Sequence, residues 1–156
     1  MTDSDWMRLA IAQAREGIAA GQSPFGSIVV LGDRAIVAAH NTVWLDTDPT
    51  AHAEVNNLRA AARALGTIDL KGCTLYSTCE PCPMCLAAIH WAKVDRLVFG
   101  ASIADAASAG FSEMPVPAST LASLGRSPLA IEGGLLAEEC AGLFREWKDA
   151  GVGRSY

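Results

Sequence analysis

Apolar residues recur every three to four positions in residues 5–20, and this spacing predicts an amphipathic helix that ends at Gly21. Two short β-branched runs, 25–30 and 34–40, follow with Gly-Asp between them, which is typical of a β-hairpin. The same criteria predict further elements in this order: a helix at 51–65 that ends at Gly66, a strand at 73–78, a helix at 83–92, a strand at 95–100, a strand at 129–134 and a helix at 135–150. The Pro- and Gly-punctuated residues 109–120 are predicted to form a loop.

This order of elements predicts the fold class. Strands interleaved with helices form a mixed or parallel sheet that has helices on both faces. The chain has 156 residues and shows no low-complexity linker. We therefore predict a single α/β domain that spans residues 1–156.

Composition and charge indicate the cell compartment and the kinds of partner to expect. Hydrophobic residues make up 51% of the chain, but no apolar run approaches the roughly 18 residues that cross a bilayer. The first ten residues are acidic and polar and do not resemble a signal peptide, so we expect a cytoplasmic protein with reduced thiols and no membrane contact. The net charge of −5 makes a nucleic-acid partner unlikely, because a polyanion needs a basic surface.

Three of the five cysteines lie between Thr78 and His90. Cys82 and Cys85 form a C-x-x-C pair at the start of a predicted helix, where the helix dipole favours thiolates. A C-x-x-C pair alone fits either a redox site or a metal site. We interpret the remaining cysteines as small buried hydrophobic residues: Cys73, Cys79 and Cys140.

A histidine and a glutamate upstream favour the metal site. His52 and Glu54 form H-x-E at the start of the preceding helix, and P-C-x-x-C follows about thirty residues later. This combination is the signature of zinc nucleobase deaminases. It predicts a Zn²⁺ ion held by His52, Cys82 and Cys85, with the fourth position left for water. Glu54 would lie beside the metal without binding it and would transfer protons.

The chain resembles the cytidine deaminase-like superfamily, and within it most closely the bacterial guanine deaminases. The segments that carry the resemblance are SPFGSIVV, DPTAHAEV, CEPCPMCLAAIHWA, AGFSEM and the final RSY. The resemblance implies a three-layer α/β/α fold with a central five-stranded mixed sheet, whose fifth strand is residues 129–134. It also implies hydrolysis of guanine to xanthine and ammonia. The closing helix is closer to that of tRNA adenosine deaminases.

The same resemblance suggests residues that contact a substrate. It implies that Asn41 hydrogen-bonds the base, that Phe25 stacks beside it and that Glu113 reaches the leaving amino group. Trp91, at the end of the zinc-binding helix, is a further substrate-binding candidate. Tyr156 ends a glycine-containing tail that, in the resembling enzymes, covers an active site and is exchanged between two subunits, so we expect a homodimer with exchanged tails. We interpret the two other histidines, His40 and His90, as structural.

Two other classes of protein stay open. A tRNA-specific adenosine deaminase would need a basic face, whereas residues 137–150 carry four acids and two bases. A non-catalytic zinc module would need a fourth protein ligand, for which Cys79 is the candidate, although Glu54 favours an enzyme. If the chain is a deaminase, guanosine, cytosine, other aminopurines, pterins and triazines remain alternative substrates to guanine.

Overall fold

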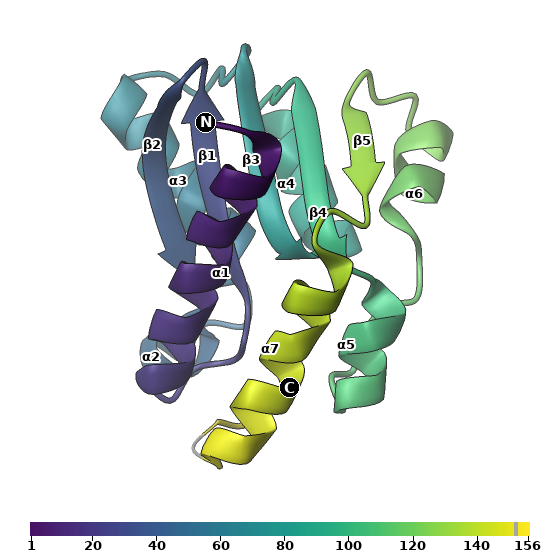
Figure 1. The fold of residues 1–156 in the computed structure, drawn as a ribbon. Coiled ribbons are helices and arrows are strands. Elements are labelled where there is room, and N and C mark those ends of the chain that lie inside the picture. The colour runs from purple at the N-terminus through teal and green to yellow at the C-terminus, as the bar shows by residue number, and fades with distance from the viewer. Residues whose placement is uncertain (152) are drawn as a thin grey trace.

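The computed structural model describes residues 1–151 and 153–156 (Figure 1). The helices of these residues are α1 (Asp3–Ala19), α2 (Val43–Asp46), α3 (Ala53–Leu65), α4 (Pro83–Trp91), α5 (Ile103–Ala109), α6 (Ala118–Leu124) and α7 (Ala137–Ala150). The strands are β1 (Gly26–Leu31), β2 (Arg34–His40), β3 (Cys73–Cys79), β4 (Arg96–Ala101) and β5 (Ala130–Gly133). None of these helices is long and apolar enough to cross a membrane.

The five strands form one mixed sheet in the order β2-β1-β3-β4-β5. β1 pairs antiparallel with both β2 and β3, whereas β3, β4 and β5 run parallel to one another. Helices cover both faces, with α1 and α7 in front of the sheet and α3 and α4 behind it (Figure 1). The predicted three-layer fold with a five-stranded mixed sheet is confirmed.

Successive strand residues point into two separate hydrophobic cores, as the twofold repeat of a strand requires. Tyr76 and Val98 pack in the core beneath α1 and α7. Their neighbours Leu75 and Leu97 are fully buried in the core beneath α3, α4 and α6. The central strands β1, β3 and β4 are therefore buried on both sides, and their few buried hydroxyl side chains include Ser27, Ser77 and Thr78.

Three short helices depart from the sequence-based expectation. The sequence pattern did not predict α2 or α5, and α6 begins inside the segment that we expected to be a loop. Each has only four to seven residues, which is too short for a clear periodicity and too short to be stable alone. Local and tertiary contacts supply the stability instead. Ser102, for example, forms a reciprocal capping box with Asp105 at the start of α5.

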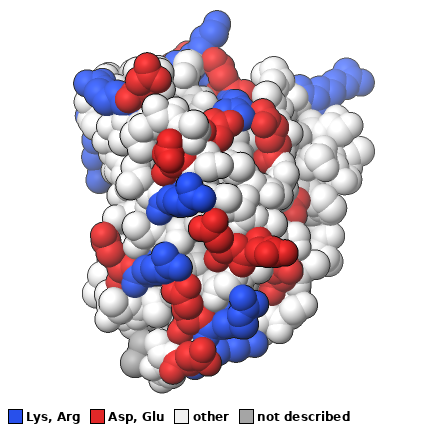
Figure 2. Space-filling view, viewed as in Figure 1, with Lys and Arg blue, Asp and Glu red and all other residues white. Residues whose placement is uncertain are grey.

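Charged side chains of both signs are interspersed on the face formed by α1 and α7 (Figure 2). Several of them pair with each other across elements, including Arg15 with Glu146 at 2.9 Å and Arg96 with Asp3. The viewed face therefore carries no continuous basic surface of the kind that binds a polyanion.

The topology brings four chain segments to one edge of the sheet. β3 and β4 are parallel, so their carboxyl ends, Cys79 and Ala101, lie side by side. α3 and α4 also begin near this edge. The ligand atoms at their N-termini therefore converge there. In open α/β sheets, this edge is where ligands bind.

Candidate metal and active site

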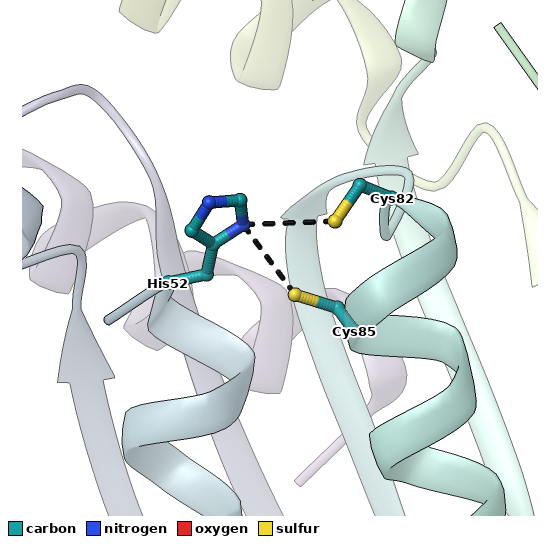
Figure 3. A group of neighbouring side chains, drawn as sticks. All are labelled: His52, Cys82 and Cys85. Atoms are coloured by element: carbon teal, nitrogen blue, oxygen red, sulfur yellow. Dashed lines mark hydrogen bonds between the residues drawn. The ribbon is translucent and has the colours of Figure 1, made fainter. Parts of the chain in front are cut away.

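The predicted zinc ligands come from the first residues of two helices (Figure 3). His52 is the N-cap of α3 and Cys82 is the N-cap of α4, and both have the extended backbone typical of that position. Neither side chain forms the usual capping hydrogen bond, so both are free to point into the space between the helices. Cys85, three residues after Cys82, points to the same place from the first turn of α4.

The spacing of these three side chains fits zinc. The Nδ1 atom of His52 lies 3.7 Å from the Cys82 sulfur and 3.5 Å from the Cys85 sulfur. Nitrogen and sulfur ligands of a tetrahedral zinc ion lie about 3.6 Å apart, given its usual bond lengths. Hydrogen bonds from Cys85 and His52 to the Cys82 sulfur lower the pKa of Cys82 to about 4, which favours the thiolate that metal binding needs.

Cys79 lies outside this group. The three ligand atoms lie within 4.8 Å of one another, and the Cys79 sulfur is not among them. Its thiol contacts the carbonyl oxygen of Ser102 at 3.5 Å, and burial raises its pKa well above the usual value. The arrangement therefore has three protein ligands, as in catalytic zinc sites, and the four-ligand alternative through Cys79 is not formed. Cys73 and Cys140 are buried, as expected.

Glu54 lies in the first turn of α3, two residues after His52, and is only 6% exposed. The hydroxyl of Ser77, on β3, donates a 3.0 Å hydrogen bond to Oε1 of Glu54. Burial raises the pKa of the Glu54 carboxyl group. A buried carboxyl group with a raised pKa and a fixed orientation is suited to exchanging protons near neutral pH.

A small pocket adjoins the ligands and Glu54. The residues around it are Phe25, Asn41, His52, Glu54, Cys79, Glu80, Cys82, Glu113 and Tyr156. Phe25 packs edge-on against Phe111, with ring centroids 4.9 Å apart. Burial raises the pKa of Glu113, whose loop follows α5. The free space is only about 20 Å³, which is room for about one water molecule.

The tail that follows α7 closes this pocket. The side-chain amide of Asn41, which is fully buried, donates a 2.6 Å hydrogen bond to the hydroxyl of Tyr156. The backbone N–H of Ser112 donates to the carbonyl oxygen of Tyr156, and the indole N–H of Trp44 donates to that of Arg154. The tail thus covers the site of its own chain, and its exchange between two subunits stays a prediction.

Trp91 does not belong to this pocket, which corrects the sequence-based expectation. Its side chain is 80% exposed and lines a separate surface cavity beside His90, Ser127 and Leu129. The reason is geometric, because Trp91 ends α4 and lies about 13 Å along the helix from Cys82, which begins it. His90 contacts Ser127 at 2.9 Å, and His40 contacts the Asn41 carbonyl oxygen at 2.8 Å; neither lines the pocket beside Glu54.

Sequence reasoning missed two side chains of the site. Ser77 orients Glu54, but a serine inside a buried strand carries no recognisable signal. Glu80 lines the pocket and accepts two backbone N–H groups. Its only signal in the sequence is its position as an acidic residue between Cys79 and Cys82, in the thiol-rich stretch.

The fold and the group of one histidine and two cysteines define a zinc-binding deaminase domain. Residues 1–101 match the cytidine and deoxycytidylate deaminase zinc-binding region, and the chain belongs to this family. The prediction of a zinc-dependent deaminase is thereby confirmed.

The relatives include guanine deaminases and tRNA-specific adenosine deaminases. The chain is 43% identical to guanine deaminase of Bacillus subtilis over 114 residues, which cover 72% of this chain and 73% of that protein. A solved structure of guanine deaminase from Nitrosomonas europaea matches 95% of this chain and 85% of its own, with a TM-score of 0.87 and 31% identity. A tRNA-specific adenosine deaminase of Buchnera aphidicola is 36% identical over 139 residues, which cover 89% of each protein.

Proposed function

We propose that this protein is a guanine deaminase, which hydrolyses guanine to xanthine and ammonia. The observation that carries the proposal is the tail that lies over the zinc-ligand group and beside Glu113. A pocket closed in this way suits a free base, which can be enclosed completely. Similarity to the guanine deaminases of two bacteria supports the same choice.

The second candidate, a tRNA-specific adenosine deaminase, is favoured by one observation. The similarity to such an enzyme extends over 89% of the chain, further than the alignment with the Bacillus guanine deaminase. Two features count against it. First, the tail would have to leave the site entirely to admit an RNA loop. Second, acidic residues outnumber basic ones, and the face in Figure 2 carries no continuous basic patch that could bind RNA.

The proposed chemistry assigns the proton transfers to Glu54. Zinc, when bound, would acidify a water molecule at its open position and so supply a nucleophile at neutral pH. The Glu54 carboxylate takes a proton from the attacking water and delivers it to N3 of guanine. A C–O bond forms at C2 and the C–N bond to the amino group breaks. The second proton of the water leaves with that nitrogen, which departs as ammonia.

The other pocket residues orient the base in this proposal. The Asn41 side chain is anchored because its Oδ1 accepts the backbone N–H of Val43 at 3.1 Å, so its amide N–H points into the pocket. Phe25 offers an apolar wall for the ring, and Glu113 hydrogen-bonds the leaving amino group. The groups are held before substrate arrives, which lowers the entropic cost of reaching the transition state.

The tail has to open during each turnover, since the closed pocket holds about one water molecule and a purine is much larger. We further propose that the protein works as a homodimer in which the tails can exchange. Gly151 (φ 64°) ends α7 in a left-handed conformation and provides a hinge at which the tail could turn toward a second copy.

A substrate panel tests the proposed function. Zinc-loaded protein is incubated with guanine, guanosine, adenine, cytosine, a pterin, an aminotriazine and a tRNA anticodon stem-loop, and ammonia release is measured, with inosine formation followed in the RNA. We expect guanine to give the highest kcat/KM, and the Glu54→Gln variant serves as the control. Deamination of the stem-loop without deamination of guanine would replace the proposal by its alternative.

A further inference from the structure

Glu80 joins two helices that flank the Glu113 loop. Its Oε2 atom accepts the backbone N–H of Ile103 at 3.2 Å, and its Oε1 atom accepts the backbone N–H of Ala118 at 2.8 Å. Ile103 is the first residue of α5 and Ala118 is the first residue of α6. One carboxylate therefore binds the N-termini of two helices at once.

These two amides depend on Glu80. The first N–H groups of a helix have no partner within the helix. Ile103 and Ala118 are buried, so a lost hydrogen bond would leave an unpaired buried donor, which is unfavourable. The N-cap of α6 is Pro117, which forms no capping hydrogen bond, so Glu80 takes over that task. The dipoles of both helices favour a negative charge at this point.

The segment between the two amides contains substrate-side residues of the site. The loop from Gly110 to Pro117 carries Glu113, and Ser112 in the same loop binds the tail through the carbonyl oxygen of Tyr156. At the other side, Glu80 lies two residues before the ligand Cys82, and its own N–H donates to the Ala101 carbonyl oxygen at 2.8 Å. Glu80 thus links the zinc-ligand loop to the Glu113 loop.

We propose that Glu80 is the positioning residue that sets Glu113 and the tail-binding Ser112 relative to the zinc ligands. It acts through the loop, because each of its two oxygens already accepts a backbone N–H. The inference rests on the proposed function of the site. It adds a residue, Glu80, that determines where Glu113 lies and so where the leaving amino group would be bound.

The variant Glu80→Gln tests this role. Its amide oxygen can accept one of the two N–H groups, but its NH₂ group then faces the other, donor against donor. We expect kcat/KM for guanine, normalised to bound zinc, to fall by about 10²-fold, since a misplacement of about 1 Å has an effect of that size. Zinc should stay at one equivalent. The control is Glu138→Gln, which removes the same charge from an exposed position in α7 and should leave kcat/KM unchanged.

A double-mutant cycle separates positioning from general loss of structure. Because Glu80 positions Glu113 as well as Ser112, the Glu80→Gln change should lower kcat/KM clearly less in a Glu113→Gln background than in the parent protein. Hydrogen exchange gives a readout that needs no substrate: the amides of Ile103 and Ala118 should exchange faster in Glu80→Gln, while those of α3 stay protected. An equal loss of activity in both backgrounds, or unchanged exchange at the two amides, would overturn the inference.

Glu80→Asp provides a second variant in case the glutamine form does not fold. It keeps the charge but is one methylene shorter, so it cannot reach both amides, and we expect an intermediate loss of kcat/KM. Full wild-type kcat/KM in this variant or in Glu80→Gln refutes the role. If no substrate in the panel is deaminated but both amides lose protection, the proposed function fails while the link made by Glu80 stands.

Discussion

Single side chains at helix starts carry the chemistry of this protein. An N-cap position normally holds a serine, threonine or aspartate whose side chain binds the helix backbone. Here His52 and Cys82 occupy such positions, but neither side chain caps its helix, so both are available as metal ligands. Glu54 is buried behind them and is fixed by Ser77.

Replacing Glu54 by glutamine tests its role in proton transfer. We expect kcat for guanine to fall by about 10²- to 10⁴-fold, because the shape of the side chain is retained and only its capacity to transfer a proton is lost. Bound zinc should stay at one equivalent, and Tm should not fall, because burying an amide costs less than burying a carboxylate. Turnover within a few-fold of the parent protein would exclude Glu54 as the shuttle.

Replacing Cys82 by serine tests the ligand set. A neutral hydroxyl is a poor zinc ligand, so elemental analysis should find well below one zinc per chain, and activity should be lost with the metal. Cys79→Ser is the matched control, because its sulfur is not part of the ligand group, and it should retain a full equivalent. The assignment of Cys82 fails if both variants bind zinc equally.

At the scale of elements, close packing of helices on the sheet holds the site edge together. A Cβ atom added to Gly26 of β1 would lie 2.2 Å from the carbonyl oxygen of Ala10 and 2.5 Å from the nitrogen of Ala14, both in α1. The backbone of α1 therefore approaches β1 as closely as only glycine permits.

A pair of glycine substitutions tests the contact between α1 and β1. Gly26→Ala should lower the free energy of unfolding by about 1–3 kcal/mol, because α1 must shift to make room. A Cβ atom added to Gly142, in α7, would meet no atom closer than 3.6 Å. Gly142→Ala should therefore raise the free energy of unfolding by about 0.5–1 kcal/mol, the usual preference of a helix for alanine. Urea denaturation measures both, and equal stability of the two variants would contradict this view of the packing.

Deleting residues 151–156 tests the tail. Without it, Asn41 loses its contact with Tyr156 and the pocket opens to water, so kcat/KM for guanine should fall by at least about tenfold. Zinc content should stay the same, because no ligand lies in the tail. Tyr156→Phe removes only the hydroxyl and should cause a smaller loss. Unchanged kinetics after the deletion would show that the tail has no part in catalysis.

At the scale of the whole molecule, folding and metal binding are separable. The two hydrophobic cores lie on opposite faces of the sheet and contain none of the three ligands. The residues that would hold the metal lie only at the edge where α3 and α4 begin. Zinc should therefore add to stability by mass action without being required for the fold.

Removal of zinc by a chelator tests this separation. We expect activity to disappear, Tm to fall to an extent that depends on free zinc, and the far-ultraviolet circular dichroism at 25 °C to remain that of the folded protein. Added zinc should restore activity. Complete unfolding on chelation would instead indicate a structural zinc site.

Features that depend on local spacing could be predicted from the order of residues alone. Alternating and helical patterns predict the five strands and four longest helices, because each element must present an apolar face to a core. The three ligands and Glu54 follow from two short motifs, in which residues two or three positions apart share a helix start. No contact between distant segments is needed to recognise them.

Features that depend on contacts between distant segments required the folded structure. It placed Trp91 on the surface, because the far end of α4 points away from the site that its start supplies. It brought Tyr156 to Asn41, 115 positions earlier, and gave Glu80 its two amide partners. Such contacts arise from the packing of whole elements at the edge of a parallel sheet, and no spacing along the chain encodes them.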